Sequence, residues 1–147
     1  MRQPFRGRIG KWSGPLKAKG QNGRVLVVED NFLMAEVVCD FLRDCDLEPV
    51  GPVGELAEAM ELARTSGFDG AILDINLRGR FCFPVCSILL ARRIPFIFPT
   101  GYGDRRLMIP SEFRGATIID KPFEPSELKE VLAQMLNLTE DTPARMH

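Results

Sequence analysis

Polar side chains end or follow four short apolar runs in this 147-residue chain. The runs occupy residues 25–28, 71–73, 96–98 and 117–119. The polar residues at their ends are Glu29, Asp30, Asp74, Thr100 and Lys121. If the runs are parallel strands, their carboxyl ends lie at one edge of a sheet, where α/β proteins bind ligands. The spacing therefore predicts that these side chains converge around Asp74.

Three carboxylates in one cluster would form a candidate binding site for a cation. Glu29, Asp30 and Asp74 would repel one another unless a cation lay between them. Mg²⁺ or another divalent ion is expected, because such hard cations prefer oxygen ligands. Asp30 and Asp74 would bind the ion directly, Glu29 would bind it through water, and a backbone carbonyl near Asn76 would add another oxygen.

The other polar residues suit a phosphoryl group. Lys121 would supply a mobile positive charge and Thr100 a hydroxyl donor. A carboxylate can attack phosphorus to form an acyl phosphate, and Asp74, alone at the end of its strand, is the best candidate nucleophile. Each residue also has an ordinary interpretation as a helix cap, a turn residue or a surface cation. Their joint occurrence at four strand ends favours a site.

The elements that would position these residues alternate between strand and helix. The run at 25–28 is continuous and rich in β-branched residues, which is typical of a strand buried on both faces. Strands are expected at residues 24–30, weakly at 49–50, and at 70–74, 96–98 and 117–120. Helices are expected at residues 31–45, 56–63, 84–91 and 126–136, with at most an irregular helix between 104 and 115. This alternation predicts an α/β fold with a parallel sheet and helices on both faces.

The first predicted helix has a cap and an apolar face. Asn31 is a favourable N-cap residue. The apolar residues that recur at helical spacing are Leu33, Met34, Val37, Val38, Phe41 and Leu42. This pattern predicts an amphipathic helix whose apolar face lies against the sheet.

Charge is distributed unevenly along the chain. Residues 1–22 contain six bases and no acid, and their glycine and proline content predicts a disordered arm. Residues 23–147 contain 13 bases and 20 acids, so this part of the chain is acidic. A net negative charge argues against nucleic acid as the main partner. Residues 138–147 are expected to form a polar tail.

No apolar run approaches the roughly 18 residues of a membrane span. Residues 1–22 also lack the apolar core of a secretory signal. A cytoplasmic protein is therefore expected.

The cysteine and histidine pattern disfavours two classes of site. The four cysteines, Cys39, Cys45, Cys82 and Cys86, form no CxxC pair, and the single histidine is His147. A zinc site and Cys-His catalysis are therefore disfavoured, and reduced thiols are expected.

Four motifs together resemble the receiver domain of two-component response regulators. They are VLVVED, ILDINL, FPTGYG and DKPF, in this order, and the resemblance covers residues 23–137. It implies a flavodoxin-like, doubly wound sheet of five parallel strands in the order 2-1-3-4-5. It also implies that Asp74 is the phosphoacceptor, that Glu29 and Asp30 form the metal-binding acid pair, and that Asn76 contributes its backbone carbonyl to Mg²⁺.

The resemblance also names residues that would respond to phosphorylation. Thr100 would be the switch hydroxyl, and Lys121 would pair with the phosphoryl group through a turn with a cis bond to Pro122. Ile118 occupies the usual position of an aromatic switch residue, so Tyr102 would be its substitute.

Three residues depart from the family pattern. The segment from Phe98 to Tyr102 partly resembles a subfamily of single-domain receivers named for Phe-Ala-Thr-Gly-X-Tyr, but Pro99 replaces the alanine. Pro99 removes a backbone donor just before the switch hydroxyl. Ile118 lacks the aromatic ring, and Asp120 stands where an apolar residue is usual and would need a partner if buried.

These observations predict a single-domain response regulator rather than a turnover enzyme. It would accept a phosphoryl group on Asp74 from a histidine kinase or a histidine phosphotransfer protein. With no DNA-binding output domain expected after residue 137, it would signal to an unknown downstream protein by contact. One alternative is a phosphorylation-independent receiver that acts as an interaction module. Another is an aspartate-nucleophile phosphohydrolase, although Asn76 stands where such an enzyme would need a second acid.

Overall fold

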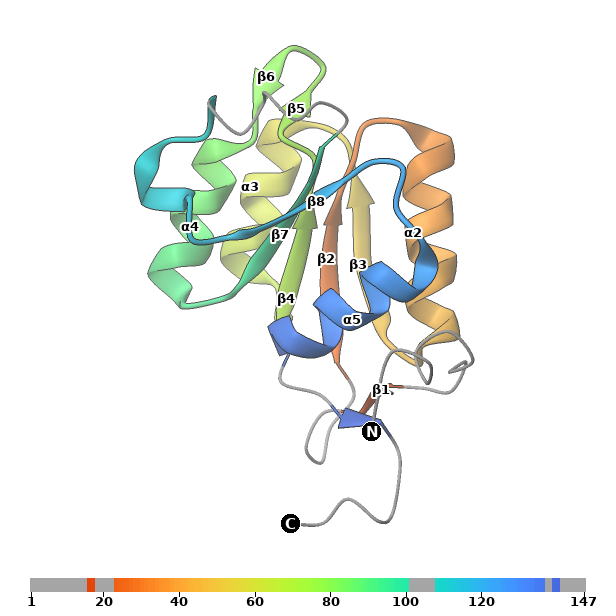
Figure 1. The fold of residues 1–147 in the computed structure, drawn as a ribbon. Helices are drawn as coiled ribbons and strands as arrows, with labels where there is room; N and C mark the ends of the chain where they lie inside the picture. Colours follow the sequence, from red (N-terminus) through yellow and green to blue (C-terminus); the bar gives the residue numbers. More distant parts are fainter. Residues whose placement is uncertain (1–15, 18–22, 101–107, 137–138, 141–147) are drawn as a thin grey trace.

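The computed structural model describes residues 16–17, 23–100, 108–136 and 139–140 (Figure 1). Five parallel strands form its central sheet, in the order β3-β2-β4-β7-β8. The strands are β2 (Arg24–Val28), β3 (Glu48–Val53), β4 (Gly70–Leu73), β7 (Phe96–Thr100) and β8 (Thr117–Asp120). Counted along the chain, this order is 2-1-3-4-5. The predicted doubly wound, flavodoxin-like fold is confirmed.

Helices cover both faces of the sheet (Figure 1). The helices are α2 (Phe32–Asp44), α3 (Leu56–Thr65), α4 (Phe83–Arg92) and α5 (Pro125–Leu136). Leu26 and Val28 of β2 belong to the core cluster that contains α3 and α4 residues, whereas Val25 and Val27 belong to the cluster with α2 and α5. Successive side chains of a strand point to opposite faces. Because both faces are covered, β2 is apolar at each of these four positions.

Helix α2 begins as predicted but is rotated relative to the expected apolar face. Asn31 is its N-cap, and its side-chain oxygen accepts a hydrogen bond from the Met34 N–H at 2.9 Å. Leu33 and Val37 are 73% and 60% exposed, so their expected place against the sheet is wrong. The inward positions belong to Ala35, Val38, Cys39 and Leu42. The helix is apolar around more of its circumference than the sheet can cover, and the smaller side chains allow it to lie close.

Two strands extend through prolines that lie outside the strands expected at residues 49–50 and 96–98. Strand β3 reaches Val53 and includes Pro52, because it is an edge strand whose register with β2 shifts between Leu26 and Val28. Strand β7 includes Pro99, which pairs with Ile119 of β8, whereas its ladder to β4 covers only Phe96 and Ile97. A missing backbone donor is tolerated where one neighbouring ladder has ended.

Short elements complete the described part of the chain. The predicted turn after Asp74 is a hairpin of β5 (Asn76–Leu77) and β6 (Arg80–Phe81). The irregular segment before β8 contains the 3-10 helix η2 (Ser111–Phe113).

Part of the predicted arm pairs with part of the predicted tail. Strand β1 (Leu16–Lys17) is antiparallel to β9 (Thr139–Glu140). The domain boundaries after residue 22 and after residue 137 stay a prediction. Within the described ranges, no helix is long and apolar enough to cross a membrane. The four cysteines are buried free thiols.

Candidate functional site

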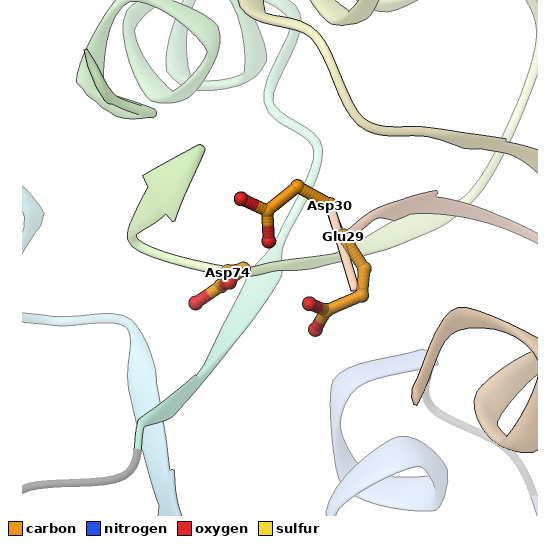
Figure 2. Close-up of side chains that lie close together, drawn as sticks. All are labelled: Glu29, Asp30 and Asp74. Atoms are coloured by element: carbon orange, nitrogen blue, oxygen red, sulfur yellow. The ribbon is translucent and has the colours of Figure 1, made fainter. Parts of the chain in front are cut away.

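Three carboxylates meet at the carboxyl edge of the sheet, as the strand ends predict (Figure 2). Glu29, Asp30 and Asp74 each offer an oxygen, and these oxygens lie within 4.8 Å of one another. The backbone N–H of Asp74 donates to the Val28 carbonyl at 2.9 Å, and that of Glu29 donates to the Val53 carbonyl at 2.9 Å. The sheet hydrogen bonding therefore continues one residue past β4 and β2 and holds two of the three acids by their backbones.

Glu29 joins the cluster to two other elements. Its Oε2 accepts a hydrogen bond from the Asn31 N–H at 3.0 Å, at the start of α2. Its Oε1 lies 3.6 Å from Nζ of Lys121, which follows β8. The structure thus brings Lys121 into the site, where its ion-pair partner is Glu29. The Lys121–Pro122 peptide bond is cis, as the family resemblance implies.

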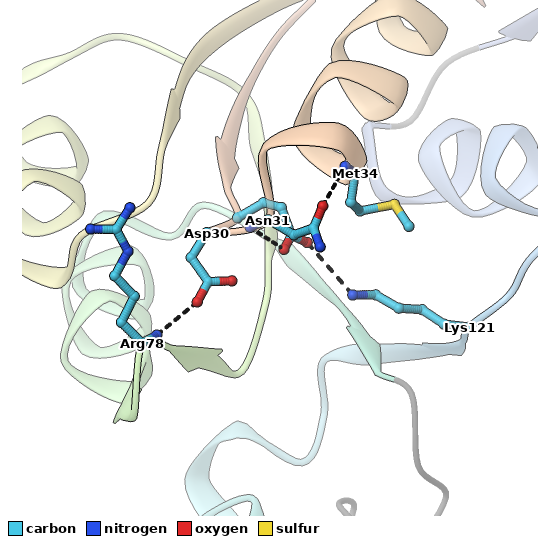
Figure 3. Close-up of polar contacts among 6 residues, drawn as sticks. Asp30, Asn31, Met34, Arg78 and Lys121 are labelled. Carbon is cyan, nitrogen blue, oxygen red and sulfur yellow. Dashed lines mark hydrogen bonds and ion pairs between the residues drawn. The ribbon is translucent and has the colours of Figure 1, made fainter.

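Asp30 is held by a contact that the sequence pattern did not indicate. Its Oδ2 accepts a hydrogen bond from the backbone N–H of Arg78 at 2.7 Å (Figure 3). The side chain of Asn76, considered only for its backbone carbonyl, accepts from the Gly79 N–H at 2.8 Å. A two-residue connection ending in glycine is typical of a hairpin turn, so Arg78-Gly79 was the available signal. Nothing in the sequence showed that this turn would reach Asp30.

Burial controls the protonation of the two innermost acids. It raises the pKa of Asp74 above the ordinary aspartate value, against the opposing charge of Lys121, and the charge of Asp30 raises that pKa further. Burial also raises the pKa of Glu29, while a hydrogen bond from the Asn31 backbone and the charge of Lys121 lower it. The clustered negative charge is therefore only partly balanced by Lys121.

The donor set fits a hard divalent cation. All three side chains offer carboxylate oxygens at mutual distances that one ion can span. The negative charge of Asp30 raises the pKa of both Glu29 and Asp74, and a bound cation would relieve this repulsion. Asp30 and Asp74 are the candidate direct ligands.

The predicted switch residues have different environments. Thr100 is buried at the end of β7, and its carbonyl accepts a 2.7 Å hydrogen bond from the Lys121 N–H, which places both residues at the same edge of the sheet as Asp74. Ile118 is half-buried and packs against the core cluster of α3 and α4. Asp120 is exposed, so the concern about a buried acid does not arise. Tyr102 lies outside the described residues.

Comparison with known proteins identifies the family. The model of the response regulator receiver domain matches residues 25–133. The transcriptional regulatory protein PdtaR of Mycobacterium tuberculosis H37Rv is 33% identical over 107 residues, which make up 71% of this chain and 52% of that protein. The chain thus spans about half the length of the curated relatives that it matches.

Solved structures show the same architecture. The solution structure of SdrG from Sphingomonas melonis Fr1 is 40% identical, with a TM-score of 0.68, and the match covers 78% of this chain and 97% of SdrG. The receiver domain of the sensor histidine kinase PA1611 from Pseudomonas aeruginosa is 24% identical, with a TM-score of 0.68, over 80% of this chain and 99% of that domain. That crystal structure has a magnesium ion coordinated in its active site cleft, and at this identity the likeness concerns the fold. The family match over residues 25–133 makes this chain a member of the response regulator receiver domains, which are signalling modules of bacterial two-component systems rather than turnover enzymes.

Proposed function

We propose that this protein accepts a phosphoryl group on Asp74 in a Mg²⁺-dependent reaction and passes the signal on by protein contact. The observation that carries the proposal is the carboxylate cluster, whose oxygens lie within 4.8 Å of one another beside a lysine. Asp74 is the acceptor because it ends β4 at the centre of the sheet, between the acid pair that follows β2 and the Thr100 end of β7.

In the proposed step, a carboxylate oxygen of Asp74 forms a bond to phosphorus. The bond between phosphorus and an imidazole nitrogen of the donor breaks, and the imidazole leaves with the electron pair. Lys121 neutralises negative charge on the phosphoryl oxygens, and in doing so it exchanges its ion pair with Glu29 for the phosphoryl group. Thr100 offers the hydroxyl that the phosphoryl group would recruit.

Mg²⁺ would supply further neutralisation of phosphoryl charge when bound. Asp30 and Asp74 would hold it directly, the Asn76 carbonyl would add an oxygen, and Glu29 would act through water. The support comes from the carboxylates themselves, whose oxygens lie within 4.8 Å of one another.

Phosphorylation can be tested by mass spectrometry. Incubation with acetyl phosphate and Mg²⁺ should add one phosphoryl group to the wild-type protein and none to Asp74→Asn. The matched control is Asp40→Asn, which changes an exposed aspartate of α2 that pairs with Arg43. An unmodified wild-type protein, or equal modification of Asp74→Asn, would contradict the proposal.

The donor is proposed to be a histidine kinase or a histidine phosphotransfer protein. An apolar surface suited to a protein donor lies beside the acids, because Phe32 and Leu33 follow Asp30 almost directly and are 72% and 73% exposed. A donor seated on α2 would bring its phosphohistidine close to Asp74. This function places the protein in the cytoplasm, where such kinases carry their phosphoryl group.

A second candidate function is that of an interaction module that does not depend on phosphorylation. The observation that favours it is that the predicted switch residues are packed into the sheet and the core. Pro99 lies within β7, Thr100 is only 2% exposed, and Ile118 packs against the core instead of presenting an aromatic ring. Equal binding of a downstream partner by wild type and Asp74→Ala would support this candidate.

A further inference from the structure

We infer that the β5–β6 hairpin is a positioning element for Asp30 and acts through the backbone N–H of Arg78. The inference rests on the proposed function, because positioning of Asp30 matters only if Asp30 binds a cation. The Arg78 nitrogen lies 2.7 Å from Oδ2 of Asp30 (Figure 3). A carboxylate has two oxygens and several lone pairs, so this hydrogen bond leaves Oδ1 available to a metal ion.

The geometry of the turn directs the amide toward Asp30. Residues 76–77 pair with 80–81, which leaves Arg78 and Gly79 as a two-residue turn. Their φ angles are 52° and 85°, and positive φ at both positions is characteristic of a type I′ hairpin. As the first residue of the turn, Arg78 is outside the ladder, and its N–H bonds to the carboxylate instead.

The hairpin is anchored firmly enough to fix this contact. At its base, the Cys82 N–H donates to the Ile75 carbonyl at 2.8 Å, and Leu77 is only 1% exposed within the core. At its tip, the Asn76 side chain accepts from the Gly79 N–H at 2.8 Å. The amide therefore comes from a hydrogen-bonded hairpin that Leu77 anchors in the core, although residues 78–81 themselves are exposed.

The side chain of Arg78 has a lesser part in the arrangement. Its Nη1 lies 3.3 Å from Oε2 of Glu55, and both side chains are more than 60% exposed. An ion pair so exposed contributes little to stability. The main chain of the turn, not the guanidinium, holds Asp30.

The hydrogen bond opposes a force that would otherwise displace Asp30. The negative charges of Glu29 and Asp74 repel its carboxylate, which is only half-buried. With the Arg78 contact formed, an Asp30 oxygen lies within 4.8 Å of an oxygen of each of the other two acids. Hydrogen-bond partners of ligating carboxylates typically contribute about 10- to 100-fold to metal affinity.

Two glycines allow a matched test. At Gly79, a β-carbon would meet nothing within 4 Å, so Gly79→Ala strains only the backbone of the turn at φ 85°. At Gly115, a β-carbon also meets nothing, and no positive φ is involved, so Gly115→Ala is the control. Asn76→Ala removes the acceptor at the tip of the hairpin, whereas Arg78→Ala removes the ion pair and keeps the N–H.

Amide hydrogen exchange tests the contact without any metal. The Arg78 amide should be protected in the wild-type protein and should exchange at least about 10-fold faster in Asp30→Ala, whereas the Cys82 amide, bonded to Ile75, keeps its protection. Loss of protection at both amides in Asp30→Ala would overturn the inference, because the hairpin would then depend on Asp30 for its structure. An unprotected Arg78 amide in the wild-type protein overturns the inference.

Calorimetric titration with Mg²⁺ tests the consequence. Gly79→Ala and Asn76→Ala should each raise the Kd for Mg²⁺ by about 10-fold. Arg78→Ala and Gly115→Ala should leave it within about 2-fold of wild type, a range in which ordinary surface changes fall. If wild type binds Mg²⁺ and Gly79→Ala behaves like Gly115→Ala, the positioning role is wrong and the proposed function stands. If wild type binds no Mg²⁺, the proposed function fails and the inference fails with it.

Discussion

Nζ of Lys121 lies 3.6 Å from Oε1 of Glu29, and both side chains are largely removed from solvent, at 22% and 7% exposed. The cation that is proposed to neutralise the phosphoryl group thus first neutralises one of the acids. Phosphorylation of Asp74 would change the partner of Lys121 and leave Glu29 to the metal ion. We propose that this exchange of partners links phosphorylation at the end of β4 to the residue that follows β8.

Removal of this lysine should destabilise the unphosphorylated protein. Lys121→Met leaves the Glu29 carboxylate without its cation, and we expect the free energy of unfolding to fall by about 1 to 3 kcal/mol, as for other buried polar groups that lose a partner. Arg43→Met, which breaks an exposed pair with Asp40, should cost no more than about 0.5 kcal/mol. Urea unfolding at pH 7 measures both, and equal losses would contradict the assigned role of the ion pair.

Removal of the central negative charge should have the opposite effect when no metal is present. Asp74→Asn relieves the repulsion that Asp74 has with Asp30 and Glu29, and we expect a gain of about 1 kcal/mol at pH 7, the Coulomb energy of two charges about 4 Å apart in water. Thermal unfolding in the presence of a chelator measures the change. Asp40→Asn, at an exposed position of α2, should have no comparable effect. A destabilised Asp74→Asn would show that the carboxylate contributes more through hydrogen bonds than it loses by repulsion.

The same carboxylates predict how stability depends on pH. Burial, the largest cause, raises the pKa of Asp74 and of Glu29 in the folded protein. In the unfolded protein the carboxyl pKa is about 4. At pH values between this pKa and the raised pKa of the folded protein, the folded state binds more protons than the unfolded state. Raising the pH across this interval therefore favours unfolding. Unfolding titrations should show stability falling through this window, and Asp74→Asn should flatten the slope. If the slope of stability against pH is the same in Asp74→Asn as in wild type, Asp74 does not contribute to the pH dependence.

Divalent cations should increase the stability of the folded protein, because they offset the repulsion among the three clustered carboxylates. At a Mg²⁺ concentration 100 times its Kd, the wild-type protein should gain about 2.7 kcal/mol of stability, because only the folded state assembles the site. Asp30→Asn should lose most of this gain. Thermal unfolding is measured in Mg²⁺ and in NaCl at the same ionic strength, which separates specific binding of Mg²⁺ from general screening of the carboxylate charges. A gain of the same size with NaCl alone would show that no specific site exists.

The exposed apolar face of α2 should matter for transfer from a protein donor but not for the chemistry itself. Leu33 is 73% exposed, so Leu33→Ala should leave stability within about 0.5 kcal/mol of wild type. It should slow transfer from a phosphorylated histidine kinase by about 10-fold, which corresponds to about 1.4 kcal/mol at an interface, and leave phosphorylation by acetyl phosphate unchanged. Leu90→Ala, 47% exposed on α4, is the matched control. Equal effects of the two substitutions would place the donor elsewhere.

Much of the site could be predicted from residue order because strand ends are local features. Asp74 follows a run of apolar residues that is buried at each position, and parallel pairing then brings it to the same edge as Glu29 and Asp30. Pro52 of β3 and Pro99 of β7 lie outside the predicted strands, because whether a strand tolerates a missing N–H depends on which neighbour pairs at that residue. The pairing of neighbouring strands is a property of the assembled sheet, and the sequence of a single strand does not specify it.

The amino-acid sequence by itself determined the parallel α/β architecture, the cap at Asn31 and the residue types at the strand ends, because hydrophobic periodicity and capping act over a few neighbouring residues. Only the tertiary structure decided which face of α2 meets the sheet, so that Leu33 remains exposed. It also decided that the Arg78 amide reaches Asp30, 48 residues away. The packing of whole elements against one another sets such contacts, because local preferences do not specify how a turn lies against a distant carboxylate.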